Sequence, residues 1–358
     1  MRTAAVVMFF LALAIQASAV DYTVTDLGSD RFFNPMAISD TGYVAGYRRS
    51  SENGPNQGFV WHNGLLSDIS YQGQETLLRG INNYGQAVGS YYTPYPNPDF
   101  GSHGFIWENG TFTPIGTLGG RESEAWDIND AGQVTGRSQT AEDSGHGFLY
   151  DSGTMTNLDP NDGWTGSEPW AINQNGDIAG YWHTPTSAQH GFRWSGGSFD
   201  DLYDPYVMWS QGSDINDLGW VVGRCGDSAC IWRGTDREDL GSLGVKSMAE
   251  GINNPGQVVG WCQLYNDSVR AFVWEDGAMS DLNSLIPSGS GWVLGEALAI
   301  NNSGQIVGGG TLNGQYHGFL LTAVPEPSGM LTLAIGLAIV SYSSFRKKTA
   351  ESSYPRAW

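Results

Sequence analysis

One phrase recurs seven times along the chain, and its period limits the possible folds. It has the form Ile-(Asn/Ser)-x-x-Gly-x-x-x-Gly, and its copies begin at Ile38, Ile81, Ile128, Ile172, Ile215, Ile252 and Ile300. Successive copies lie 43 to 48 residues apart, with one interval of 37. Such a period is typical of stacked or ring-shaped repeat folds, because no single unit can bury both of its faces. We therefore expect one cooperative array rather than separate domains.

Each unit has the pattern of four short strands. The first ends on the recurring isoleucine, and Asn-x-x-Gly then supplies a tight turn in which glycine takes the left-handed conformation. The second strand is short and β-branched, as in Gln257–Val259. The third carries a second recurring phrase, Gly-Phe-x-Trp, as in Gly104–Trp107, and a turn such as Glu108–Gly110 leads to the fourth. Short strands with glycine turns and no helical periodicity predict an all-β repeat.

Seven four-stranded units fit a seven-bladed β-propeller. The seventh unit lacks a fourth strand after Gly318–Leu321, whereas an unassigned fourth strand, Tyr22–Leu27, stands before the first unit. We expect this N-terminal strand to complete the last blade and close the ring; an open β-solenoid, the alternative, would not need it. First strands should then line a central channel and fourth strands the outer rim. The tight turns should share one face and the long loops the other, where function usually resides.

Charge and the first residues bear on location. Arg2, the apolar run Ala4–Ile15 and a small-residue site ending at Ala19 predict a secretory signal peptide over residues 1–19. The propeller should span residues 20–323.

Between Val20 and Ala323 there are 12 basic and 35 acidic residues, so nucleic-acid binding is excluded as a function class. We expect no cofactor, with weak binding of calcium as the alternative.

The repeats resemble a family of extracellular proteins named after a His-Ala-Phe (HAF) tripeptide. In this chain the tripeptide is His-Gly-Phe at His103, His146, His190 and His317, and Arg-Ala-Phe at Arg270. Thr117–Gly120 and Leu282–Leu285 also match the family's companion phrases. The resemblance covers about residues 21–321 and implies an extracellular location, without an activity that can be carried over.

The segment from residue 324 to 358 resembles a PEP-CTERM sorting signal. It contains an apolar run, Met330–Val340, between two short motifs, and the motif residues are Val324, Pro325, Glu326 and Pro327, then Arg346, Lys347 and Lys348. The resemblance implies passage through the secretion machinery and transient anchoring in the inner membrane. An exosortase-type protease would then cleave near Pro-Glu-Pro, leaving the mature form at the cell surface or extracellular. A retained C-terminal anchor is the alternative.

Three cysteines leave at least one unpaired within the chain, and their spacing excludes a structural zinc site. Cys225 and Cys230 flank a short loop between two predicted strands, so a disulfide between them is conceivable. Cys230 occupies a position that holds phenylalanine in other repeats. We therefore favour a buried, reduced Cys230.

Motifs of the common hydrolases and phosphate-binding loops are missing. Each recurrent histidine is expected to cap its strand through a neighbouring backbone group rather than bind a metal. Carboxylates are plentiful on the predicted loops and inner strands, and a pair could act as acid and base in a glycosidase or lyase. These carboxylates are Glu75, Glu122, Glu124, Asp127, Glu168, Asp204, Asp214, Glu250 and Glu296.

Aromatic residues of the variable segments are the candidate ligand contacts, since rings flanked by small polar residues suit sugars. Packing between blades is the alternative role. The selected residues are Tyr91, Tyr92, Tyr95, Trp164, Tyr181, Trp182, Tyr206 and Trp209. The sequence thus favours a non-enzymatic propeller that binds or organises extracellular polysaccharide. A polysaccharide-degrading enzyme with paired carboxylates and a protein-binding surface scaffold remain the alternatives.

Overall fold

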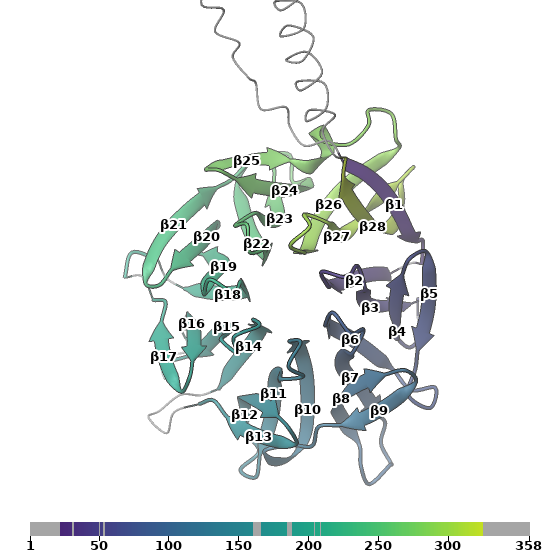
Figure 1. The fold of residues 1–358 in the computed structure, drawn as a ribbon, viewed down its shortest axis with the longest axis vertical. Coiled ribbons are helices and arrows are strands. Elements are labelled where there is room, and N and C mark those ends of the chain that lie inside the picture. The colour runs from purple at the N-terminus through teal and green to yellow at the C-terminus, as the bar shows by residue number, and fades with distance from the viewer. Residues whose placement is uncertain are drawn as a thin grey trace, which may run out of the picture. The chain divides into compact units, whose positions relative to one another are not determined.

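The computed structural model describes residues 22–324, apart from residues 31, 50, 53, 160–165, 185–187, 204 and 208. Within this part, residues Tyr22–Ala323 form a compact ring of seven four-stranded antiparallel sheets, a seven-bladed β-propeller (Figure 1). The predicted fold is confirmed. The predicted signal peptide and most of the sorting segment lie outside the described residues; Val324 is exposed. No helix in the described part is long and apolar enough to cross a membrane.

Every blade follows the same strand order from channel to rim. Blade 1 contains β2 (Phe32–Ile38), β3 (Val44–Arg49), β4 (Gln57–His62) and β5 (Leu65–Ile69). Blade 2 contains β6 (Thr76–Ile81), β7 (Ala87–Thr93), β8 (Gly101–Glu108) and β9 (Thr111–Pro114). Blade 3 contains β10 (Gly119–Ile128), β11 (Val134–Thr140), β12 (Gly145–Asp151) and β13 (Thr154–Asn157). Blade 4 contains β14 (Ser167–Ile172), β15 (Ile178–His183), β16 (Gln189–Ser195) and β17 (Ser198–Asp201).

The remaining blades complete the ring. Blade 5 contains β18 (Ser210–Ile215), β19 (Trp220–Cys225), β20 (Ser228–Arg233) and β21 (Asp236–Gly241). Blade 6 contains β22 (Lys246–Ile252), β23 (Val258–Gln263), β24 (Val269–Glu275) and β25 (Ala278–Asp281), and a 3-10 turn, η1 (Leu282–Ser284), follows it. Blade 7 contains β26 (Trp292–Ile300), β27 (Ile306–Leu312), β28 (Gln315–Ala323) and β1 (Tyr22–Gly28).

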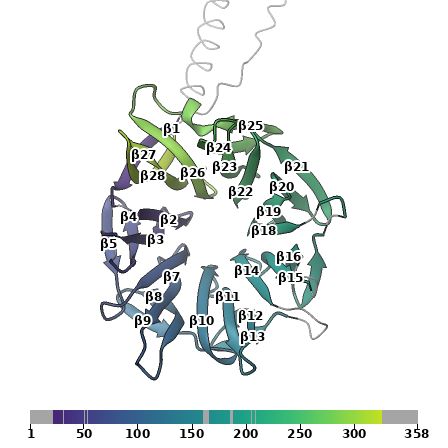
Figure 2. The same ribbon diagram turned by 180° about the vertical axis from the view of Figure 1, so that it is seen from behind.

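The N-terminal strand closes the ring as expected. In blade 7 the order is β1-β28-β27-β26, and Tyr22 pairs antiparallel with Ala323 while Thr25 pairs with Leu320. The first and last strands of the described chain therefore lie side by side in one sheet. Both views show the first strands of the blades around the channel and the fourth strands at the rim (Figure 2).

The hydrophobic core lies between neighbouring blades. The phenylalanine of each Gly-Phe-x-Trp phrase is fully buried, as Phe59 and Phe148 illustrate. Around Phe59, one cluster joins Val44 of blade 1 to Val307 of blade 7. Because each blade buries its faces against its neighbours, the apolar driving force for folding acts on the whole ring.

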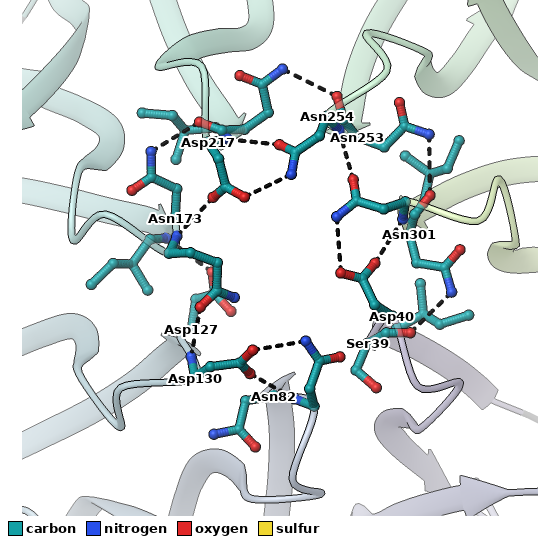
Figure 3. Close-up of a pocket in the computed structure, with 18 of the residues that line it drawn as sticks. Ser39, Asp40, Asn82, Asp127, Asp130, Asn173, Asp217, Asn253, Asn254 and Asn301 are labelled. Atoms are coloured by element: carbon teal, nitrogen blue, oxygen red, sulfur yellow. Dashed lines mark hydrogen bonds between the residues drawn. The ribbon is translucent and has the colours of Figure 1, made fainter.

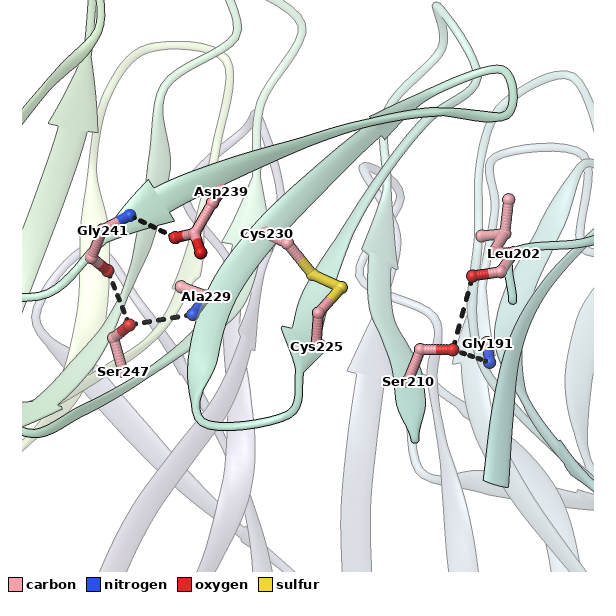
Figure 4. Close-up of a disulfide and its surroundings, with 9 residues drawn as sticks. All are labelled: Gly191, Leu202, Ser210, Cys225, Ala229, Cys230, Asp239, Gly241 and Ser247. Carbon is pink, nitrogen blue, oxygen red and sulfur yellow. Dashed lines mark hydrogen bonds between the residues drawn. A yellow bond between two sulfur atoms is a disulfide. The ribbon is translucent and has the colours of Figure 1, made fainter. Parts of the chain in front are cut away.

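The two cysteines of blade 5 form a disulfide, which corrects the expectation that Cys230 is reduced (Figure 4). Cys230 is fully buried at the phenylalanine position, as expected. However, Cys225 at the end of β19 pairs with Ser228 at the start of β20, and this tight hairpin leaves the two cysteine Cα atoms 6.1 Å apart. That separation lies within the range of disulfides. The third cysteine, Cys262, is buried and free.

Candidate functional site

The innermost strand of every blade carries a β-bulge two residues before the recurring isoleucine. In blade 3, Ala125 pairs with Gly136 and Asp127 with Thr135, so Trp126 between them has no partner on the next strand. The same register shift occurs in the other six blades. Bulges re-aim side chains and often stand next to functional sites. The seven bulged residues, which we call the bulge ring, are Met36, Arg79, Trp126, Trp170, Ser213, Glu250 and Leu298.

The second glycine of the recurring phrase is explained by this bulge. A Cβ atom added to Gly136 would lie 2.0 Å from the backbone oxygen of Glu124, which the bulge brings over the glycine. The corresponding distances in the other six blades are 1.8 to 2.0 Å. No other residue fits at this position without moving backbone. The repeated sequence phrase therefore encodes the bulge, and the bulge forms the ring.

The bulge ring lines a cavity in the central channel. All seven of its members border a cavity of about 290 Å³, together with Gln211 and Met248 from the same strands. This volume is close to the lower end of small-molecule pockets, roughly 300–1,000 Å³. Unlike the turns and the buried phenylalanines, the seven positions vary, with six residue types among them and tryptophan twice. Residues needed only for the fold would be nearly the same in every blade, as they are in the turns. The differences among the seven bulge-ring residues therefore make this ring the candidate for a specific site.

Two tryptophans form the aromatic side of this cavity. Trp126 of blade 3 stacks on Trp170 of blade 4, with ring centroids 5.0 Å apart and planes at 26°. The Nε1–H of Trp126 donates to Oε2 of Glu124 at 3.3 Å, and that same oxygen lies 3.7 Å from Nη2 of Arg79. Glu124 therefore holds both the indole and the guanidinium in place.

Three residues that line the cavity each carry a buried polar atom without a partner. Nε of Arg79, Nε1 of Trp170 and Oγ of Ser213 are buried and form no hydrogen bond with any described residue. A buried donor without an acceptor costs about 1–3 kcal/mol, so native structures usually satisfy such groups. All three can donate. These three groups are therefore candidate donors to a ligand that carries acceptor oxygens.

Glu250 supplies the acidic side of the cavity. Its Oε1 accepts from Nε1 of Trp261 at 2.9 Å. Desolvation by burial raises the pKa of Glu250 to about 7; the Trp261 bond opposes this shift, and the charge of Glu296 adds to it. The carboxyl group can therefore donate or accept near neutral pH.

Asp127 and Asp214, two of the candidate catalytic carboxylates, instead join blades. Asp127 accepts from Ile128 N in its own blade at 2.8 Å and from Ile172 N in the next at 2.9 Å. Asp214 makes the equivalent bonds to Ile215 N and Ile252 N, both at 2.8 Å. Burial raises the pKa of each to about 7, although these bonds lower it in part. With both oxygens occupied by backbone N–H groups, neither is placed to act as acid or base.

The remaining candidate carboxylates lie apart from this cavity. Glu75 is bonded to Asn56, Glu168 lies 3.6 Å from Arg137, and Glu122 borders a separate cavity over blade 3. Glu296 lines a cavity over blade 7. Asp204 lies outside the described residues.

The opposite end of the channel is a ring of hydrogen bonds between the Asn-x-x-Gly turns (Figure 3). Nδ2 of Asn129 donates to the backbone oxygen of Asn173 in the next blade at 3.0 Å. The same link recurs in five further blades. An outer set of bonds runs in parallel, for example from Asn83 N to Oδ1 of Asp130 at 2.9 Å. These polar side chains therefore hold the blades together, and their repetition has an architectural explanation.

The structure does not gather the loop aromatics in one cavity. Tyr91 is buried and stacks on Tyr71, with ring centroids 4.0 Å apart. Tyr92, Tyr95 and Tyr206 are exposed. Tyr181, Trp182 and Trp209 are partly buried; Arg224 covers the ring of Trp209 at 4.6 Å, and Trp182 packs on the core between blades 3 and 4. Trp164 lies outside the described residues. Their role in ligand binding stays a prediction.

The recurrent histidines lie on third strands and bond locally. His103 donates from Nε2 to the backbone oxygen of Asp99 at 2.9 Å, as expected of a cap. His190 and His317 instead pair with Asp201 and Asp26 of the adjacent outermost strands, at 3.2 and 3.0 Å. The expected backbone contact is replaced there by a side chain, because the fourth strand places a carboxylate opposite each histidine.

No family model and no curated protein matches the chain. Among solved structures, YCF48 bound to a D1 peptide aligns over 86% of this chain and 97% of its own length, with a TM-score of 0.50 and 11% identity. A gluconolactonase from Xanthomonas campestris aligns over 86% of this chain and 92% of its own, with a TM-score of 0.42 and 9% identity. The first likeness supports the propeller fold, which serves binding scaffolds and enzymes alike.

Proposed function

We propose that this protein binds extracellular polysaccharide without cleaving it, and that the bulge ring is the binding site. The observation that carries the proposal is the combination, in one channel cavity, of the stacked Trp126–Trp170 pair with three unpartnered buried donors. Indole faces suit the C–H faces of sugar rings. The donors of Arg79, Trp170 and Ser213 suit hydroxyl and ring oxygens at the sugar's edge.

The charge of the cavity favours a neutral sugar. Arg79 is compensated by Glu124 at 3.7 Å, and Glu250 adds a carboxyl group that is partly ionised near neutral pH. The acidic propeller as a whole also repels anionic polymers at long range. An anionic polysaccharide would need divalent cations to bridge it to such a surface.

A polysaccharide-degrading enzyme is the second candidate, because Glu250 lines the channel cavity and Glu124 contacts two of its lining residues, Trp126 and Arg79. Glu250 has a pKa of about 7, suited to a general acid, and Glu124 is held beside Arg79. Glycosidases use two carboxyl groups at a set separation. Release of reducing ends separates this function from binding alone.

A glycan array on the purified protein, followed by calorimetric titration of the best neutral oligosaccharide, tests the proposal. Trp170→Ala should weaken binding at least about tenfold, since stacking on a sugar ring and a lost donor are together worth more than about 1.4 kcal/mol. Ser213→Trp, which fills the cavity from its wall, should do the same without removing packed atoms. Tyr265→Ala is the matched control, because Tyr265 is 86% exposed and borders none of the channel cavities.

Three results would replace the proposal. Retained binding in Trp170→Ala and Ser213→Trp, with loss in Tyr95→Ala or Tyr206→Ala, would place the site on the loops. Release of reducing ends that stops in Glu250→Gln would make the protein an enzyme. Absence of any glycan binding or turnover would leave a protein-binding scaffold.

Export and processing belong to the same proposal, since a matrix ligand requires an extracellular protein. We expect the secretion machinery to remove residues 1–19 and an exosortase-type protease to cleave near Pro325–Pro327. Intact-mass analysis of protein recovered from the cell surface checks both sites. A surface form that still ends at Trp358 would exclude processing and favour a retained anchor.

A further inference from the structure

A second cavity lies over blade 7, on the side of the long loops. Its volume is about 460 Å³, larger than that of the channel cavity. Blade 7 contributes most of its lining, while β2 of blade 1 and β24 of blade 6 form its sides. The lining residues are Phe32, Asn34, Val269, Val293, Gly295, Glu296, Gly309, Gly310, Thr311 and Tyr316.

Blade 7 departs from the repeat in a strand that lines this cavity. The two positions after the second recurring glycine are Gly309 and Gly310 in blade 7. In the other blades, the first of these positions holds Tyr47, Ser90, Arg137, Tyr181, Arg224 and Trp261. Neither Gly309 nor Gly310 has a positive φ that would demand glycine. Glycine is required at Gly310 because an added Cβ would lie 2.6 Å from the backbone oxygen of Val293 on the neighbouring strand.

Tyr316 lies across the opened strand. A Cβ on Gly309 would stand 2.1 Å from the Tyr316 hydroxyl oxygen, so the glycine makes room for the phenol. That hydroxyl donates to Oδ1 of Asn34 in blade 1 at 3.4 Å. The phenol is thereby fixed as a polar edge of the cavity.

Apolar residues form the opposite edge. Phe32 and Val293 are 38% and 41% exposed. The guanidinium of Arg49 lies 4.2 Å from the Phe32 ring centroid and supports the ring. Apolar walls with a few placed polar groups are typical of small-molecule sites.

The two cavities follow one another along the same two strands. On β2, Met36 lines the channel cavity and Asn34 lines the blade 7 cavity; on β26, Leu298 and Glu296 are divided in the same way. Two strand residues span roughly 7 Å, so the two cavities are lined by neighbouring positions on each strand.

We propose that the two cavities form one extended site that binds an oligosaccharide of two or more rings. One ring occupies the channel, and the chain leaves it over blade 7, between Tyr316 and the Phe32–Val293 edge. This inference rests on the proposed function and adds the length of the ligand and the direction in which it leaves the channel.

Calorimetric titration with chain-length series tests the extension, using neutral β-1,4-linked glucose from monosaccharide to hexasaccharide. The matching series of α-1,4-linked galacturonate is the anionic comparison, for which the charge of the cavity predicts no binding. Val293→Trp fills the blade 7 cavity from an exposed strand position. Val245→Trp is the matched control, because Val245 is 51% exposed and lines neither cavity. For the wild type, affinity should rise about tenfold or more between one ring and three. Val293→Trp should lose that rise and keep the monosaccharide affinity, whereas Val245→Trp should behave like the wild type.

Two results would overturn the extension while leaving the channel site in place: equal affinity for all chain lengths, or a chain-length effect that survives Val293→Trp. Loss of monosaccharide binding in Trp170→Ala, with binding kept in Val293→Trp, supports the channel site. Binding of neither series by the wild type would contradict both proposals. Melting temperatures of the three variants verify that each retains the propeller.

Discussion

Nδ2 of Asn301 in blade 7 donates to the backbone oxygen of Ser39 in blade 1 at 3.0 Å, across 262 residues of sequence. This bond is one of six equivalent links between neighbouring Asn-x-x-Gly turns. Blade 1 has serine where the other blades have asparagine. The backbone oxygen of Ser39 accepts the bond from Asn301, but Ser39 has no side-chain amide to donate to the backbone oxygen of Asn82. The ring of amides is therefore complete except at one position.

Ser39→Asn should complete this ring and stabilise the protein. The new amide would donate to the backbone oxygen of Asn82, and one net hydrogen bond is worth about 1 kcal/mol. Asn216→Ala should do the opposite, since its side chain bonds Asn253 O at 3.1 Å and two N–H groups of its own turn. Denaturant unfolding measures both. A lower free energy of unfolding for Ser39→Asn would contradict the architectural role of the ring.

Gly223→Ala should destabilise blade 5 strongly. The added Cβ would lie 1.9 Å from the backbone oxygen of Gln211, which the bulge holds in place. Overpacking of this kind costs about 3 kcal/mol. Gly295→Ala is the control, because its Cβ would find nothing closer than 3.4 Å. Equal free energies of unfolding for the two variants would show that the bulge carbonyl does not demand glycine.

Glu250→Gln should change how stability depends on pH. The pKa of Glu250 is about 7 in the folded protein against 4.5 for a free glutamate. Between these values the folded state keeps a proton that the unfolded state releases, so raising the pH through this window destabilises the wild type. Glutamine can still accept from Trp261 and cannot ionise. The melting temperature of the variant relative to wild type should thus rise from pH 5 to pH 8, and a constant difference would contradict the shift.

Thiol titration of the denatured, unreduced protein should find one free thiol per chain, that of Cys262. Cys225 and Cys230 are joined across only a few residues, so reduction should lower stability little, because short loops lose little entropy on closure. Three free thiols would contradict the disulfide.

The fold was predictable because its determinants repeat. Ile128, the Asn129 turn and Phe148 have counterparts in other blades, so local rules applied seven times give one architecture. The site was not predictable in this way, because it lies where the repeats differ. The bulge ring includes residues as different as Trp126, Arg79 and Ser213. Only the β-bulge, which the sequence does not show directly, places them around one channel cavity. Their equal spacing, two residues before the recurring isoleucine, is the signal that sequence reasoning missed.

Two other differences between expectation and structure have equally local causes. The phenylalanine found at the position of Cys230 in other repeats predicts a buried, reduced thiol. In the structure, the short β19–β20 hairpin places Cys225 close enough to form a disulfide with it. The sequence makes Asp127 and Asp214 candidates for acid–base catalysis, because it shows where carboxyl groups occur but not which hydrogen-bond donors they meet. In the structure, backbone N–H groups of two blades occupy their oxygens.

A crystal structure of the protein soaked with a neutral oligosaccharide from the array tests the central claim most directly. The account predicts a sugar ring in the channel, stacked against the Trp126–Trp170 pair, with oxygens within hydrogen-bond distance of the Arg79, Trp170 and Ser213 donors. A sugar bound only at Tyr95, Tyr206 or Trp209 on the loops, with an empty channel, would contradict it.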